Sequence, residues 1–159
     1  MGLLTELTYI HLEVTSAIDE IERSIAQARS QRHEEETVRQ RLSGLRPWVK
    51  GLRSVLVDYF DHQRSELFPR VQRVFGADFE ELNGLSGFHG LILEALDEFA
   101  EELFGLIGGE DEGIHPMGIA YLELLFDDFR ELYESHCAQE RKFYETYSTI
   151  IFPGGAIAD

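Results

Sequence analysis

Apolar residues recur along almost the whole chain at alternating steps of three and four positions, the spacing of one face of an α-helix. No stretch shows the sustained alternation of apolar and polar residues that an amphipathic strand requires. The pattern therefore predicts an all-α fold with four long helices. In chain order, the four faces comprise Leu4, Leu7, His11, Val14, Ile18, Ile21 and Ile25; Leu52, Val55, Tyr59, His62, Glu66 and Val71; Leu85, His89, Ile92, Leu96, Phe99 and Leu103; and Leu122, Leu125, Phe129, Tyr133 (or Leu132), His136, Glu140 and Phe143.

Glycine and proline mark the breaks between these periodic stretches. Gly44 and Pro47 lie near the start of the second predicted helix, and Gly76 separates the second helix from the third. A glycine-rich and acidic stretch at 108–113 separates the third helix from the fourth. The segment 31–46 is compatible with an extension of either neighbouring helix or with a loop.

Four helices joined by short breaks predict an up-down-up-down antiparallel four-helix bundle. The chain of 159 residues is long enough for one well-packed domain and too short for two. We assign residues 1–149 to the bundle and residues 150–159 to an apolar C-terminal tail. The tail either folds back on the body or joins a subunit contact in a homodimer.

The charge balance excludes two classes of partner. The chain has 30 acidic and 14 basic residues and a net charge of -16, whereas binding to nucleic acid or to an anionic membrane depends on clustered Lys and Arg. There is no run of 18 apolar residues for a membrane span, and no basic segment precedes an apolar run as in a signal peptide. A single cysteine, Cys137, excludes an intramolecular disulfide and suits a reducing compartment. These features predict a cytoplasmic protein.

Each predicted apolar face is interrupted by a histidine, and two of these histidines have a glutamate one helical turn further on. Two other histidines, His33 and His115, are expected on the solvent side, although a break in the first connection would bring His33 back towards the site. The six candidate site residues are His11, His62, Glu66, His89, His136 and Glu140.

The spacing of the histidines from the predicted turns brings them to one level of the bundle. His89 lies 19 residues before Gly108, and His136 lies 19 residues after Met117, so each arm rises roughly 28 Å at about 1.5 Å per residue. His62 and His89 lie 14 and 13 residues from Gly76. His11 joins the same level if the first connection spans about 31–42.

Imidazoles and carboxylates together suit Fe, Mn or Zn better than Ca or Mg. Two carboxylates among four imidazoles favour two metal ions, with Glu66 and Glu140 as bridges and the histidines at the two ends. A structural zinc site would instead have four ligands in a closed shell. A lone core histidine is more often an ordinary packing residue than a ligand. However, burying all six groups without a metal would cost several kcal/mol, so we favour a metal site.

The order H…HxxxE…H…HxxxE, with HQRSELFP at 62–69, resembles the hemerythrin-like (HHE cation-binding) domains over roughly residues 5–147. The resemblance implies a four-helix bundle with two Fe ions in an oxo- or hydroxo-bridged di-iron centre. It also implies that both glutamates bridge the irons. The ligands that it implies are His11, His62, Glu66, His89, His136 and Glu140.

Three positions depart from the pattern of this family. Leu93 stands where oxygen carriers have a second histidine of the third helix, and Arg141 stands where they have an aspartate, so that Glu140 takes the acidic role. Gln63 stands where some eukaryotic iron-sensing members have an acidic ligand. The missing imidazole opens a coordination position on one iron, which weakens the case for reversible dioxygen carriage.

We therefore expect a non-haem di-iron protein that binds or senses a small ligand, such as dioxygen or nitric oxide, or that handles iron. The alternative is a di-iron redox enzyme that reduces peroxide or nitric oxide, or that donates iron for repair of iron-sulfur clusters. A structural bundle stabilised by its metal is a third option. No nucleophile or acid–base set stands apart from the predicted metal ligands, so any catalysis would be metal-centred.

Three tyrosines lie within about one turn of the predicted ligands: Tyr59, Tyr133 and Tyr144. They are candidates for hydrogen bonds to the ligands, although core packing is the favoured interpretation. Cys137 is rotated about 100° from the ligand face of its helix. It is expected to be a packing residue or an exposed thiol.

Overall fold

The structure is a computed structural model, and it describes residues 3–31, 34–109 and 113–151. These residues are almost all helical and none lies in a β-strand, which confirms the predicted all-α fold. The elements are α1 (Leu3–Ser30), α2 (Glu35–Ser43), α3 (Arg46–His62), the π-helix η1 (Gln63–Leu67), α4 (Phe68–Phe75), α5 (Glu80–Gly108) and α6 (Pro116–Ile151).

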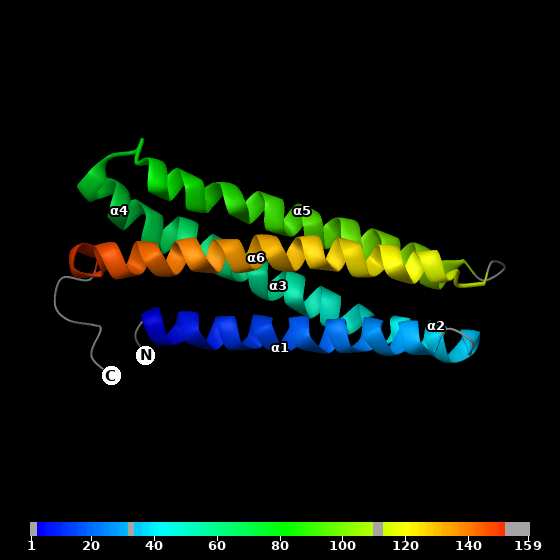
Figure 1. Cartoon of the computed structure of the whole chain (residues 1–159). Helices are drawn as coiled ribbons and strands as arrows, with labels where there is room; N and C mark the ends of the chain where they lie inside the picture. The colour runs from blue at the N-terminus through cyan, green and yellow to red at the C-terminus, as the bar shows by residue number, and fades with distance from the viewer. Residues whose placement is uncertain (1–2, 32–33, 110–112, 152–159) are drawn as a thin grey trace.

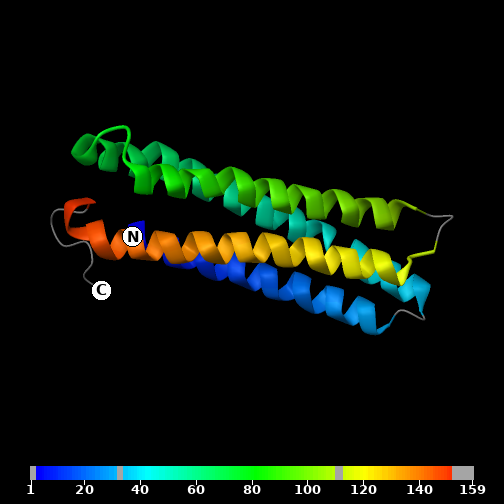
Figure 2. The ribbon, with the colours of Figure 1, turned by 45° about the horizontal axis from the view of Figure 1, so that its top comes forward.

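The long helices α1, α3, α5 and α6 lie side by side (Figures 1 and 2). α1 packs against α3 and α6, and α5 also packs against α3 and α6. The short helix α2 lies at one end of the molecule and α4 at the other (Figure 1). Each long helix therefore has two long neighbours, and their apolar faces enclose a common interior.

The interior consists of two hydrophobic clusters at different levels. The larger cluster includes Leu56, Ile92 and Phe129, and the smaller one includes Leu67, Leu85 and Phe143. Burial of such a side chain contributes about 1.5–3 kcal/mol relative to leaving it exposed. Three elements pass from one cluster to the other: the α3–η1 segment, α5 and α6. The predicted site residues of these elements fall in the interval between the two clusters.

The predicted breaks coincide with the observed ends of helices. α3 begins at Arg46, directly after Gly44 and Leu45, and α5 ends at Gly108. α4 ends at Phe75, and Gly76 has a φ of 92°, a left-handed conformation that glycine adopts without a steric penalty. Glycine at this position therefore lets the chain turn sharply from α4 towards α5.

The segment 31–46, for which the sequence left alternatives open, contains a helix of its own. Val38 and Leu42 bury one face of α2, and α2 packs against α1 and α5. Arg39 donates hydrogen bonds to the carbonyl oxygens of Ile107 at 2.6 Å and Gly109 at 3.1 Å. These carbonyls have no intrahelical donor at the end of α5, so α2 both covers the core and caps another helix.

The turn after His62 is a π-helix, in which the hydrogen bonds span one residue more than in an α-helix. Pro69 gives a local reason for the wide turn. Proline has no backbone N–H to donate to the carbonyl of Ser65, and in an α-helix its ring would clash with that carbonyl. The extra residue changes which side chains of residues 63–67 face the core.

Within the described residues, no helix combines the length and the apolarity that crossing a membrane would require. α6 continues to Ile151, whose side chain is buried in the smaller cluster, while Ile150 is exposed. The rest of the predicted tail, residues 152–159, and His33 lie outside the described residues.

Candidate metal centre

The pair formed by His136 and Glu140 is the most deeply buried part of the predicted site. The two side chains lie one turn apart on α6, and their residues are 0% and 2% exposed. Nε2 of His136 lies 3.1 Å from Oε2 of Glu140, although these atoms do not form a hydrogen bond of regular geometry. The helical spacing therefore brings an imidazole and a carboxylate together inside the core, as the sequence predicted.

His11 approaches the same carboxylate from α1. Its Nε2 lies 3.5 Å from Oε1 of Glu140, and its Nδ1 lies 2.7 Å from the hydroxyl oxygen of Tyr133. The side chain of His11 is 31% exposed, so it stands at the edge of the site. Glu140 thus joins His11 of α1 to His136 of α6.

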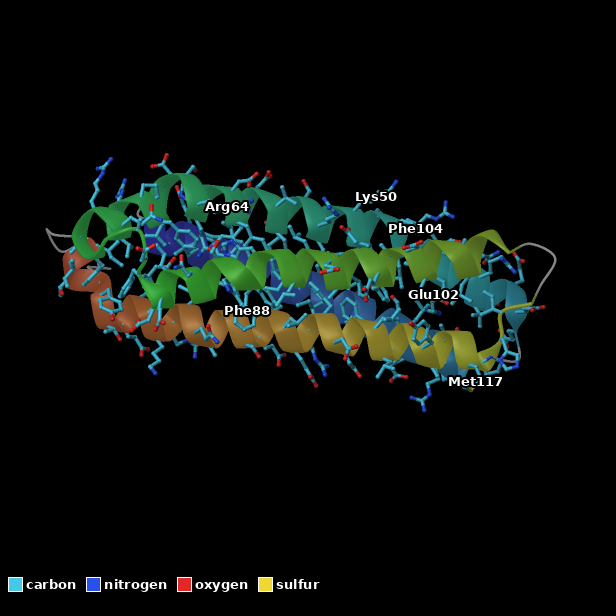
Figure 3. The ribbon with its side chains drawn as sticks, turned by 90° about the horizontal axis from the view of Figure 1, so that it is seen from above. Lys50, Arg64, Phe88, Glu102, Phe104 and Met117 are labelled. Atoms are coloured by element: carbon cyan, nitrogen blue, oxygen red, sulfur yellow. The ribbon has the colours of Figure 1, made fainter. Side chains whose placement is uncertain are left out.

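His89 comes to the site from α5. Its ring stacks on Phe60 with the centroids 4.0 Å apart, and its centroid lies 5.1 Å from that of His136. Phe88, labelled in Figure 3 on α5 beside α6, has its ring 6.1 Å from His136. Both ring nitrogens of His89 are buried and have no hydrogen-bond partner. Aromatic rings hold this imidazole in place without using its nitrogens.

The first HxxxE pair, His62 and Glu66, differs from the second in burial, because only the second pair lies wholly inside the core. Nε2 of His62 is buried and has no hydrogen-bond partner. The side chain of Glu66 is 55% exposed, and its Oε2 lies 3.9 Å from Nη2 of Arg70. Because η1 is a wide turn, Glu66 faces solvent and is not brought to Glu140. Its role as a bridge stays a prediction.

Gln63 is a buried polar residue of the site region that the sequence reasoning did not place there. It is 1% exposed, and its Nε2 donates hydrogen bonds to the hydroxyl oxygens of Tyr59 at 2.9 Å and Tyr144 at 3.3 Å. Its Oε1 is buried and has no partner. Two signals in the sequence pointed to this residue. The family resemblance puts an acidic ligand of some members at position 63, and Pro69 disfavours a regular α-helical turn over 65–69 and thereby the predicted register.

The neighbouring tyrosines and the cysteine make polar contacts in addition to packing against the core. Tyr59 and Tyr133 are buried, in keeping with the core packing that the sequence favoured, and both also make the hydrogen bonds described above. Cys137 is partly buried against the core, and its Sγ lies 3.6 Å from Nδ1 of His11. His115 is exposed, as predicted, and its Nδ1 accepts a hydrogen bond from the backbone N–H of Met117 at the start of α6.

Burial and hydrogen bonding set the protonation of three of these groups. Burial raises the pKa of Glu140, but the contacts with His11, His136 and Tyr59 outweigh it and lower that pKa to about 2. The contacts with Cys137 and Glu140 raise the pKa of His11 to about 10. Burial and the neighbouring His136 lower the pKa of His89 to about 3. Glu140 is therefore ionised and His89 neutral at pH 7, which are the forms that coordinate metals, whereas His11 is protonated and would have to lose its proton to coordinate one.

The orphaned polar atoms of the site match the donors of a metal centre. Imidazole nitrogens of His62, His89 and His136 and a carboxylate oxygen of Glu140 are buried without hydrogen-bond partners, and orphaned buried polar groups are rare because each costs about 1–3 kcal/mol. As the side chains stand, no group of three or more His, Cys, Asp or Glu among the described residues is arranged to hold one metal ion. Metal binding would therefore require these side chains to turn towards one another.

A groove between α1 and α6 opens onto this cluster. It has a volume of about 690 Å³, which lies within the usual range for small-molecule sites of about 300–1,000 Å³. His11 and Glu140 line its floor together with Tyr133, Cys137 and Tyr144. Two of the predicted ligands, His11 and Glu140, therefore lie beside a space large enough for a small molecule.

Comparison of the chain with protein-family models, with curated proteins and with solved structures gave no match.

Proposed function

We propose that this chain is a hemerythrin-like protein that holds two iron ions and binds or senses a small ligand, such as dioxygen or nitric oxide, or handles iron. The fold that goes with this proposal is an up-down-up-down antiparallel four-helix bundle. The side-by-side packing of α1, α3, α5 and α6, each against two of the others, supports that arrangement.

The observation that carries the proposal is the set of buried nitrogen and oxygen atoms of His62, His89, His136 and Glu140 that have no hydrogen-bond partner. A buried polar atom is normally paired with another protein group, water or a metal. Three imidazoles and a carboxylate left unpaired between two hydrophobic clusters would be a costly way to build a core that serves stability alone. A pair of divalent or trivalent cations would satisfy these atoms together.

His11, His62, His89, His136 and Glu140 are the residues that would hold the irons, and Glu140 is the bridging ligand in this proposal. Glu66 would have to turn inward from solvent to join the set. These five protein ligands would leave room for a small exogenous ligand beside the irons, which would supply Lewis-acid or redox chemistry there. The groove between α1 and α6 would admit that ligand to the side of the site formed by His11 and Glu140.

The test is the metal content of the protein produced with iron, measured by elemental analysis together with its visible absorption spectrum. We expect close to two irons per chain and an absorption band that shifts reversibly when azide or dioxygen is added. One zinc per chain, or no metal, would rule out the proposed centre.

A matched pair of variants makes this test specific. His89→Leu removes two orphaned nitrogens, whereas His115→Leu removes an exposed histidine that only contacts the start of α6. The first variant is expected to lose most of its iron and the second to keep it. Equal iron contents in the two variants would show that metal binds elsewhere.

The alternative is a di-iron redox enzyme, and the groove onto Glu140 and His11 is the feature that favours it, because a reacting molecule needs room beside the metals. Catalytic disappearance of peroxide or nitric oxide would support the enzyme. A stable and reversible shift of the absorption band without turnover would support binding or sensing.

A further inference from the structure

α5 and α6 form a second groove, which shares no lining residue with the groove between α1 and α6. The two helices lie side by side (Figure 3) and run antiparallel, with His89 against His136 and Phe99 against Phe126. The groove has a volume of about 500 Å³, and its lining includes Leu91, Glu94 and Glu98 of α5 and Asp128, Glu131 and Ser135 of α6. These residues are three or four positions apart on each helix and so share one face. A groove between two such faces has the shape that receives a third helix.

Large apolar side chains are exposed along the same surface. Leu91 in the groove is 51% exposed. On α6, Leu124 and Tyr121 lie four and seven positions before Asp128, so they continue the helical face of Asp128, and they are 55% and 49% exposed. A single exposed apolar residue is common on a protein surface, but several on one face with polar residues around them are typical of an interaction site.

The groove also carries four carboxylates without a basic partner. They are Glu94, Glu98, Asp128 and Glu131. Within the described residues, none of their side chains makes an ion pair or a hydrogen bond, whereas the neighbouring carboxylates of Asp97 and Asp127 contact Arg53 and Arg130. Glu94 and Glu131 lie midway between the two ring contacts that join α5 to α6, so they are at the same level and their like charges repel each other. A basic partner would remove this repulsion.

We propose that this face of α5 and α6 is a docking site for a basic amphipathic helix of a partner protein. The apolar side of that helix would cover Leu91, Leu124 and Tyr121, and its Lys and Arg side chains would pair with the carboxylates of the groove. α5 has no Lys or Arg, so charge favours a basic partner over a second copy of this chain, whose net charge is -16. The inference does not depend on the proposed metal centre, because none of these residues belongs to it.

A synthetic helical peptide of about 18 residues, with leucines on one face and lysines on the other, is a suitable probe. Its affinity is measured by calorimetry at an ionic strength of about 0.15 M, which screens exposed charges beyond roughly 8 Å. A second peptide has the same composition in scrambled order, so it has the same charge but no apolar face. We expect the amphipathic peptide to bind at least about tenfold more tightly. Equal affinities would mean that the acidic chain attracts any polycation, and would overturn the proposal.

A pair of charge variants locates the site. Glu94→Lys combined with Glu131→Lys reverses two charges in the groove, whereas Glu6→Lys combined with Asp19→Lys makes the same change in net charge at exposed positions of α1. We expect the first double variant to bind the amphipathic peptide at least about tenfold more weakly and the second to change the affinity less than about twofold. Equal losses would show attraction by net charge alone and would contradict a docking site on α5 and α6.

A pair of apolar variants tests the other half of the proposed contact. Leu91→Ser combined with Leu124→Ser removes apolar area from the face, and Tyr9→Ser combined with Leu12→Ser removes it from α1, where both side chains are also exposed. The peptide should bind about tenfold more weakly to the first double variant and unchanged to the second, with equal helix content by circular dichroism. Unchanged binding to both would overturn the proposal. Self-association of the natural chain that the first double variant abolishes would also overturn it, because the occupant would then be a second copy.

Discussion

The Nδ1 atom of His11 lies 2.7 Å from the hydroxyl oxygen of Tyr133, across the interface between α1 and α6. This contact occupies one ring nitrogen and leaves the other, Nε2, directed at Glu140 at 3.5 Å. Histidine ligands in metal sites almost always have their second nitrogen engaged in this way, because the contact fixes the orientation of the ring. Tyr133 thus orients His11, a partly exposed histidine of the site.

Removing this contact should weaken the centre without unfolding the protein. Tyr133→Phe keeps the ring in the core but leaves His11 free to rotate. We expect the iron affinity, measured by competition with a chelator, to fall about tenfold. Tyr121→Phe on the same helix, where the side chain is exposed, is the control. Equal iron affinities for the two variants would show that Tyr133 does not orient His11.

The two glutamates of the HxxxE pairs should respond differently to substitution. Glu140 is buried between His11 and His136, whereas Glu66 faces solvent beside Arg70. We therefore expect Glu140→Gln to bind less than one iron per chain and Glu66→Gln to keep nearly the full amount, as measured by elemental analysis. Equal losses in the two variants would mean that Glu66 turns inward when iron binds, and would restore both carboxylates as bridges.

In the absence of metal, the unpaired polar groups of the site should lower the free energy of unfolding. His89→Leu replaces an imidazole with two unpaired nitrogens by an apolar side chain of similar size, packed beside Phe60 and Phe68. We expect the free energy of unfolding in urea, with a chelator present, to rise by about 1–2 kcal/mol. A decrease would show that the His89 nitrogens are satisfied in the metal-free protein.

The contact between α2 and the end of α5 leads to a prediction about the free energy of unfolding that does not involve the metal centre. Arg39→Ala leaves the carbonyl oxygens of Ile107 and Gly109 without their donor. The free energy of unfolding should fall by about 1–2 kcal/mol. Arg23→Ala, which removes only an exposed ion pair with Glu20, should change it by less than about 0.5 kcal/mol. Equal effects would show that Arg39 is not a cap.

Most of the helices and the burial of His89, His136 and Glu140 could be predicted from the spacing of residues, because an α-helix repeats every 3.6 residues wherever it is regular. Gly44, Gly76 and Gly108 mark real ends of helices, and the pair His136 and Glu140 does share a buried face. These predictions depended only on local geometry within one regular helix.

The rest could not be predicted from the sequence, because there the helical regularity fails or residues distant in the sequence decide the arrangement. The π-helix at 63–67 breaks the assumption of about 100° per residue, so it turns Gln63 inward and Glu66 outward. The contact of Cys137 with His11 joins residues 126 positions apart, and periodicity on one helix carries no information about the rotation of its neighbour. The position of helix α2 likewise involves a distant residue, because Arg39 donates a hydrogen bond to the carbonyl oxygen of Ile107.

The division of the interior into two hydrophobic clusters determines what surrounds the candidate centre. The π-helix at 63–67 changes the rotation of the helical segment between α3 and α4. As a result, α3 and α4 each pack in their own rotational register against α5 and α6. The polar groups of the candidate centre lie between the two clusters. The surroundings of these groups therefore depend on both clusters: His89 packs against Phe60 of the larger cluster and against Phe68 of the smaller one.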